Sequence, residues 1–96
     1  MSRNYSKEQK EKIWAKENGN KSTSTDPFGR PVNKDNYETD HIIPYSKGGK
    51  TTLKNAQVLS PKSNSEKSDK LRGIINGKSF NVDKTTNKMT VKSSKK

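Results

Sequence analysis

The chain reads Glu38-Thr39-Asp40-His41-Ile42-Ile43-Pro44 around its single histidine. The loop sequence Ser46-Lys47-Gly48-Gly49 follows it, and two asparagines come later. Imidazole, with an ordinary pKa near ~6.5, can take a proton from water at neutral pH, so His41 is the candidate general base. The side-chain oxygens of Asp40 and Asn64 are hard donors that suit Mg²⁺, Mn²⁺ or Ca²⁺. These residue types together favour a metal-assisted hydrolysis.

The order of these residues resembles the HNH endonuclease family, whose ββα-metal motif is two strands followed by a helix. The family's last element is Leu-Cys-x-x-Cys-Asn-x-x-Lys, and here residues 59–67 read Leu-Ser-Pro-Lys-Ser-Asn-Ser-Glu-Lys. The resemblance runs from Asp26 to Lys70. It implies a divalent-metal-dependent endonuclease that hydrolyses DNA phosphodiester bonds, by nicking or by double-strand cleavage, with Mg²⁺ or Mn²⁺ as cofactor. It also implies that Asn55 fixes the loop carrying His41 through side-chain hydrogen bonds and does not touch the metal.

The chain departs from the family pattern in its complete lack of cysteine. Many HNH domains hold a structural zinc with two Cys-x-x-Cys pairs; here Ser60 and Ser63 stand at the second pair, and Thr25 and Phe28 at the first. No structural zinc is expected, and packing, turns and hydrogen bonds must hold the fold. Asn64 stands where the third letter of HNH would be histidine. This His-Asn-Asn version is similar to the HNH domains of RNA-guided DNA-cutting effectors and favours Mg²⁺ over Zn²⁺.

The adjacent positions of Asp40 and His41 pose a geometric requirement. On a regular strand their side chains point to opposite faces, so both reach one phosphate only if the strand ends or kinks there. Pro44 and the Gly48-Gly49 pair favour such an ending. Glu38 shares the strand face of Asp40 and is expected either to support the metal ligands from behind or to act as a structural salt-bridge partner.

The composition predicts a polyanionic partner. The chain has 96 residues and a net charge of +11, with 32% charged and 23% hydrophobic residues, so one domain spanning 1–96 with a small core is expected. Disorder remains the alternative for both ends. No apolar run is long enough for a membrane span or a signal peptide, which predicts an intracellular, cytoplasmic protein with no membrane partner. No small-molecule substrate is expected, and the sequence leaves the oligomeric state open.

Basic residues concentrate around the motif and are expected to contact the DNA backbone. They are Lys47, Lys50, Lys62, Lys67, Lys70 and Arg72. A solvated surface is the alternative reading for any single one of them. No helix-turn-helix or finger is visible, so weak base specificity is expected.

The expected elements begin with a helix over Lys7–Asn18, because Ser6 and Gln9 form a capping-box pattern and Gly19 suits its end. Its Trp14 is expected in the core, although stacking on a base is the alternative. Residues 18–36 read as polar turns. Strands are expected over 37–43 and 57–59, and then a helix that starts at Ser60, runs to about Leu71 and ends near Gly73.

The C-terminal third predicts a β-hairpin. Asn76-Gly77 is a turn signal, and alternating apolar residues flank Thr85-Thr86-Asn87. Lys92–Lys96 is expected to be a basic tail. The fold class is therefore α+β: a small single domain with a ββα-metal core motif over 37–72, an N-terminal helix and a C-terminal hairpin.

Two other functions fit the same sequence. One is a non-catalytic basic DNA- or RNA-binding protein on an HNH-like fold, and the other is a nuclease toxin domain. The complete metal and base set argues against the binding-only reading, since a retired site would be free to lose it.

Overall fold

The computed structural model describes residues 4–93. It begins with α1 (Lys7–Asn18), which has the predicted bounds. The Ser6 hydroxyl accepts a hydrogen bond from the Gln9 backbone N–H at 3.1 Å, and the Gln9 side chain accepts one from the Ser6 N–H at 2.8 Å. This capping box satisfies two N–H groups that a helix start otherwise leaves unpaired. Gly19 ends the helix with a φ of 63°, which favours glycine.

The segment expected to contain only turns forms a short hairpin of β1 (Thr23–Thr25) and β2 (Pro31–Asn33). The expectation missed these strands because they are short and polar, with only Val32 buried. Their connecting turn is closed by Asp26, whose Oδ1 accepts hydrogen bonds from the backbone N–H groups of Phe28 at 2.9 Å and Arg30 at 3.0 Å.

The ββα arrangement is present. β3 (Glu38–His41) and β4 (Ala56–Leu59) pair antiparallel, and α2 (Pro61–Lys67) follows. A 3-10 turn, η1 (Tyr45–Lys47), lies in the loop between the strands. Gly49 is required in this loop, because a Cβ at that position would lie 1.7 Å from the carbonyl oxygen of Ile43.

The start of α2 was predicted correctly and its end was not. The Ser60 hydroxyl accepts a hydrogen bond from the Ser63 N–H at 3.1 Å, and Pro61 occupies the first helical position. The helix stops at Lys67, because Ser68 adopts a φ of 51° that leaves the helical region. Gly73 does not end a helix but lies inside a strand.

The C-terminal third is a three-stranded antiparallel sheet of β5 (Arg72–Ile75), β6 (Lys78–Asp83) and β7 (Lys88–Ser93). The predicted hairpin is the β6–β7 pair, and the Asn76-Gly77 turn adds β5, which sequence reasoning had not found. The expected basic tail is partly wrong, because Lys92 and Ser93 belong to β7. Residues 94–96 of that tail lie outside the described part.

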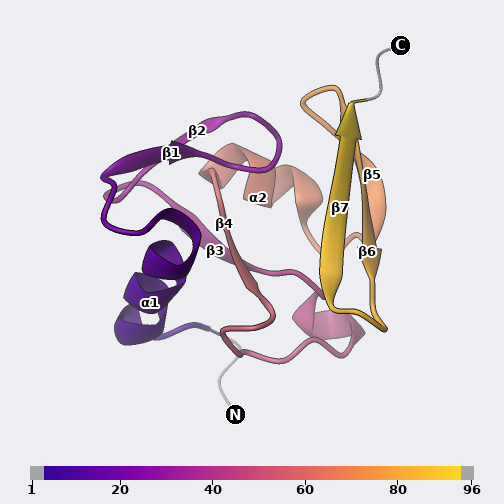
Figure 1. Cartoon of the computed structure of the whole chain (residues 1–96). Helices are drawn as coiled ribbons and strands as arrows, with labels where there is room; N and C mark the ends of the chain where they lie inside the picture. Colours follow the sequence, from indigo (N-terminus) through magenta and orange to yellow (C-terminus); the bar gives the residue numbers. More distant parts are fainter. Residues whose placement is uncertain (1–3, 94–96) are drawn as a thin grey trace.

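Two clusters of buried side chains form the core. In Figure 1 the β3–β4 pair lies between α1 on one side and the β5–β7 sheet on the other, with the β1–β2 hairpin above. The first cluster lies beside α1 and the second beside the sheet. Trp14 is 1% exposed, which confirms its core position. The first cluster comprises Tyr5, Ile13, Trp14, Val32, Ala56 and Val58, and the second Phe28, Ile43, Leu59, Ile75, Phe80 and Val82.

A buried carboxylate links the parts of the chain where zinc-binding cysteines stand in many HNH domains. Besides closing its own turn, Asp26 accepts a hydrogen bond through Oδ2 from the Ser60 N–H at 3.1 Å, and it interacts with the Ser63 hydroxyl. Arg30 adds bonds to Ser63 at 3.3 Å and to Glu66 at 2.9 Å. Burial by itself raises the pKa of Asp26, but these hydrogen bonds, led by the one from Ser63, outweigh it and lower the pKa.

Replacing Asp26 with alanine is expected to lower the free energy of unfolding by ~2–4 kcal/mol, because it leaves three backbone N–H groups without their charged acceptor. Asp35→Ala, at an exposed carboxylate just past β2, is the matched control and should change little. Urea unfolding of the three proteins measures the difference. EDTA should leave all three midpoints unchanged, since no structural zinc is expected. A drop of the wild-type midpoint in EDTA would show instead that a metal holds this fold.

Candidate active site

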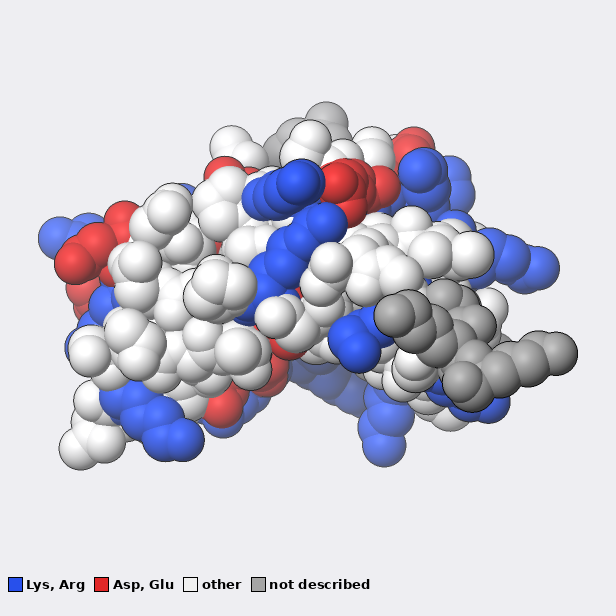
Figure 2. Space-filling model, turned by 90° about the horizontal axis from the view of Figure 1, so that it is seen from above, with Lys and Arg blue, Asp and Glu red and all other residues white. Residues whose placement is uncertain are grey.

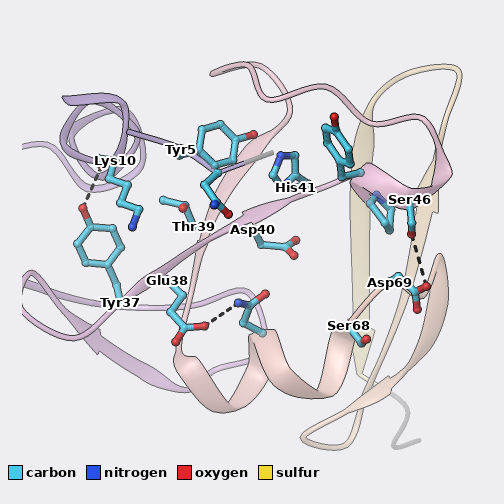
Figure 3. A pocket seen from close by; sticks show the side chains of 14 residues that line it. Tyr5, Lys10, Tyr37, Glu38, Thr39, Asp40, His41, Ser46, Ser68 and Asp69 are labelled. Carbon is cyan, nitrogen blue, oxygen red and sulfur yellow. Dashed lines mark hydrogen bonds between the residues drawn. The ribbon is translucent and has the colours of Figure 1, made fainter. Parts of the chain in front are cut away.

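A polar pocket of about 530 Å³ opens where β3, α2, η1 and the start of α1 meet. Asp40, His41 and Asn64 all line it, whereas Asn55 does not. Figure 3 shows Asp40 and His41 at the end of the same strand, Glu38 nearer α2, and Tyr5 reaching in from the N-terminal side. The side chains that the sequence singles out as metal ligands and base therefore line the same pocket, Asp40 and His41 from β3 and Asn64 from α2.

Both Asp40 and His41 reach this pocket because the strand ends between them and Pro44. β3 stops at His41, as the geometric requirement demanded. Asp40 lies opposite Gln57 in the ladder and is 6% exposed, whereas His41 is half-buried. The carboxylate thus faces inward toward α2, and the imidazole lies where the backbone leaves the sheet.

Asp40 is held by a buried cation. Its Oδ2 lies 3.0 Å from the Lys67 ammonium and accepts a hydrogen bond from the Gln57 amide at 2.9 Å. Lys67 also donates to the carbonyl oxygens of His41 and Ile42, both at 3.2 Å. Both of these contacts of Asp40 involve Oδ2, and within residues 4–93 its Oδ1 carries no hydrogen bond. Burial raises the pKa of Asp40, while the charge of Lys67 and the Gln57 bond act in the opposite direction.

The position of Lys67 corrects one expectation. We expected this lysine on the DNA-facing surface, but it is 0% exposed. A buried ammonium needs a counter-charge and acceptors, and Lys67 finds them in Asp40 and two backbone carbonyls. Lys67 is therefore not one of the DNA contacts. Its ammonium binds Asp40 and the backbone at the end of β3 instead.

The His41 ring is fixed on several sides. Its Nε2 lies 2.9 Å from the Thr51 hydroxyl, which can donate or accept, and its ring centroid lies 4.7 Å from that of Tyr5 and 5.9 Å from that of Tyr45.

The Tyr5 hydroxyl donates to the carbonyl oxygens of Thr52 and Asn55 at 3.0 and 3.1 Å. Burial, aided by the charge of Asp40, raises the pKa of Tyr5 to about 12. Nothing in the sequence indicated this role for Tyr5, because it precedes α1 and lies far from the motif.

Asn55 ties the loop that follows His41. It is 1% exposed, and its Oδ1 accepts a hydrogen bond from the Ile43 N–H at 2.8 Å. Its Nδ2 donates to the carbonyl oxygens of Ile43 at 3.1 Å and Lys50 at 2.9 Å. Asn87, from the β6–β7 turn, donates to the same Oδ1 at 3.0 Å. The arrangement matches the positioning role that the family resemblance implies for Asn55.

Asn64 lies in the first turns of α2, and its Nδ2 donates to Glu38 Oε1 at 2.6 Å. This bond orients the amide, so that its Oδ1 is the end left for another ligand. Glu38 makes no ion pair within residues 4–93, so its observed partner is Asn64 and not a cation. Of the two expectations for Glu38, the described contacts favour support of Asn64 over a salt bridge.

The donors present fit a hard divalent cation with few protein ligands. Asp40 Oδ1 and Asn64 Oδ1 are oxygen donors at the pocket, which suits Mg²⁺ or Mn²⁺ and does not suit a soft thiophilic metal. Residues 4–93 contain no group of three or more His, Cys, Asp or Glu side chains that could hold a metal. Water and the phosphate would therefore have to complete the coordination sphere.

The remaining basic residues of the expected DNA surface are accessible. Lys50, Lys62, Lys70 and Arg72 are exposed, while Lys47 is half-buried and lies 3.7 Å from Asp69 in an ion pair. Lys10, which sequence reasoning missed, also lines the pocket. Figure 2 shows that on the face seen from above Lys and Arg are spread over the surface, with a few Asp and Glu between them.

The order β3, β4, α2 and the side chains at the pocket resemble the ββα-metal arrangement. The HNH endonuclease family model matches residues 29–70, and this confirms the resemblance for the segment that contains Asp40, His41, Asn55 and Asn64. The match indicates a nuclease, a hydrolase whose substrate is nucleic acid. No curated protein and no solved structure matches the chain. Residues 4–93 contain no helix long and apolar enough to cross a membrane.

Proposed function

We propose that this protein is a DNA endonuclease that hydrolyses phosphodiester bonds with one divalent cation, Mg²⁺ or Mn²⁺. The observation that carries the proposal is the meeting of Asp40, His41 and Asn64 in one polar pocket, with Asp40 and Asn64 each anchored through one side-chain atom. The other oxygen of each remains for a ligand. A metal ligand with one side-chain atom bound to the protein and another left for the cation is held in place before the substrate arrives.

Each residue has a role in the proposed mechanism. Asp40 and Asn64 would hold the cation, which when bound supplies positive charge to the phosphate and leaving oxygens. His41 takes a proton from the attacking water on a ring nitrogen. Thr51, Tyr5 and Tyr45 hold that ring, and Asn55 fixes the loop behind it. Glu38 and Lys67 position Asn64 and Asp40.

The surface cations serve binding in this proposal. Lys47, Lys50, Lys62 and Lys70 would neutralise DNA phosphates and Arg72 would contact the DNA beside them, so affinity should fall steeply with salt, by ~0.9 in log K per log salt for each phosphate neutralised. Because both side chains of the Lys47–Asp69 pair still reach solvent, at 38% and 61% exposed, the pair contributes little stability and can open to a phosphate.

The test uses three labelled substrates of one sequence: a DNA duplex, a single DNA strand and an RNA hairpin. Each is incubated with the protein in Mg²⁺, in Mn²⁺ and in EDTA, and products are resolved on denaturing gels. Cleavage of DNA in either metal and none in EDTA is the expected result. Salt-sensitive binding of all three substrates without any cleavage would support the non-catalytic binding protein instead.

A further inference from the structure

The outer face of the β5–β7 sheet is built unlike its inner face. The strand register alternates buried apolar residues such as Phe80 and Val82, which face the core, with exposed residues that face away from it. Figure 1 shows this sheet at one edge of the molecule. The principal outward side chains are Arg72, Ile74, Asn81, Lys88, Thr90 and Lys92.

The chemistry of this face is that of a surface that contacts base edges. Arg72, Asn81 and Thr90 form one row across the three strands, and Ile74 is 69% exposed in the next. Arginine pairs with guanine through two hydrogen bonds, asparagine does so with adenine, and apolar side chains contact the thymine methyl group. Exposure of the Ile74 side chain to water is unfavourable, and contact with another apolar group would bury it.

The charge of the face complements DNA. Arg72, Lys88 and Lys92 point outward, and the one carboxylate among the outward residues, Asp83, is engaged by its own turn. Its Oδ1 accepts hydrogen bonds from the N–H groups of Thr85 and Thr86, at 2.9 and 3.4 Å. The outward residues thus carry three cations against one carboxylate, which lies opposite Lys88, and this excess of positive charge favours a polyanion over an acidic or neutral protein partner.

The size and position of the face also fit a duplex. Neighbouring strands lie about 4.8 Å apart, and the major groove, ~12 Å wide, admits a two-stranded ribbon, so the β5–β6 pair that carries Arg72, Ile74 and Asn81 can enter it. Arg72 follows Asp69 by three residues, and Asp69 lines the pocket. Three residues span at most ~10 Å, so one duplex can touch both regions well within a helical turn of ~34 Å.

We infer that the outer face of the β5–β7 sheet docks in the major groove of duplex DNA beside the cleavage site and gives the protein a base preference. This inference rests on the proposed function for its substrate, and it replaces the expectation of weak base specificity. The sheet lies outside the segment matched by the HNH family model, so the inference does not rest on that match.

The experiment selects bound sequences from a randomised DNA duplex library with the wild-type protein in EDTA. Affinities for the selected duplex and a scrambled one are then measured by anisotropy for wild type, Asn81→Ala, Arg72→Lys and Lys62→Ala. Asn81→Ala leaves the charge unchanged, and Arg72→Lys keeps the charge but loses the two-bond geometry. Both should lose about 10-fold on the selected duplex and little on the scrambled one. Lys62→Ala, on exposed α2 surface, should weaken both equally.

Failure of the inference is separable from failure of the nuclease proposal. An absence of any enriched sequence, or a discrimination that Asn81→Ala and Arg72→Lys leave intact, overturns the inference. Cleavage of the selected duplex in Mg²⁺ is measured in parallel. If the protein discriminates the selected duplex through the sheet but never cuts it, the nuclease proposal is overturned and the inference of base preference through the β5–β7 sheet is supported. Because the substituted side chains are exposed, thermal melts should match wild type and exclude misfolding as the cause.

Discussion

His41→Ala is expected to reduce the rate of DNA cleavage by ~10²- to 10⁴-fold, the usual loss when a general base is removed. The ring lies at the pocket and contacts Tyr5, Tyr45 and Thr51. The core clusters do not include it, so its loss should leave the fold intact. Cleavage is measured under single-turnover conditions, and circular dichroism checks the fold.

His41→Gln is the matched variant that separates a base from a positioning group. Glutamine can still hydrogen-bond Thr51, but its amide does not take a proton at neutral pH. It should therefore be as inactive as His41→Ala. If His41→Gln kept wild-type rates, the ring would be a structural group and some other residue would have to activate the water.

Asp40→Asn is expected to remove cleavage and also to destabilise the protein by ~3–5 kcal/mol, because it leaves the Lys67 ammonium buried without its counter-charge. A small domain has only ~5–15 kcal/mol to lose, so the unfolding midpoint should fall clearly. An inactive Asp40 variant is therefore weak evidence for metal binding unless its stability is measured.

The double variant Asp40→Asn with Lys67→Met resolves this ambiguity. It removes both buried charges while keeping side chains of similar size, so most of the lost stability should return. It should nevertheless stay inactive, since the carboxylate is still missing. Urea unfolding of wild type, both single variants and the double variant gives the coupling energy of the pair. Strictly additive losses would show that Asp40 and Lys67 act independently, contrary to the observed ion pair.

The sequence predicted elements whose signals are local. The capping box at Ser6 and Gln9 set the start of α1, Ser60-Pro61 set the start of α2, and Asn76-Gly77 set a tight turn. These signals work because the residues satisfy the backbone next to them. The convergence of Asp40 and His41 with Asn64 came from the ordered family resemblance, since Asn64 is distant in the sequence from the other two and no local rule joins them.

The features that sequence reasoning missed depend on long-range packing. Lys67 lies among several surface lysines, and only the packing of α2 against β3 carries its ammonium to Asp40. Tyr5 reaches His41 from the far end of the chain. β5 reads Arg-Gly-Ile-Ile, and its glycine resembled a helix end, but pairing with β6 makes this segment a strand. Local propensity does not contain these contacts.

The most direct test of the nuclease site is cleavage of supercoiled plasmid by wild type and His41→Gln, purified in parallel, in Mg²⁺, in EDTA, and in EDTA followed by excess Mg²⁺. Wild type should convert the plasmid to nicked or linear product in Mg²⁺, stop in EDTA and resume when Mg²⁺ is restored, while His41→Gln stays at least ~10²-fold slower wherever Mg²⁺ is present. Equal cutting by the two proteins, or wild-type cutting that persists in EDTA, would contradict a metal-dependent site with His41 as its base.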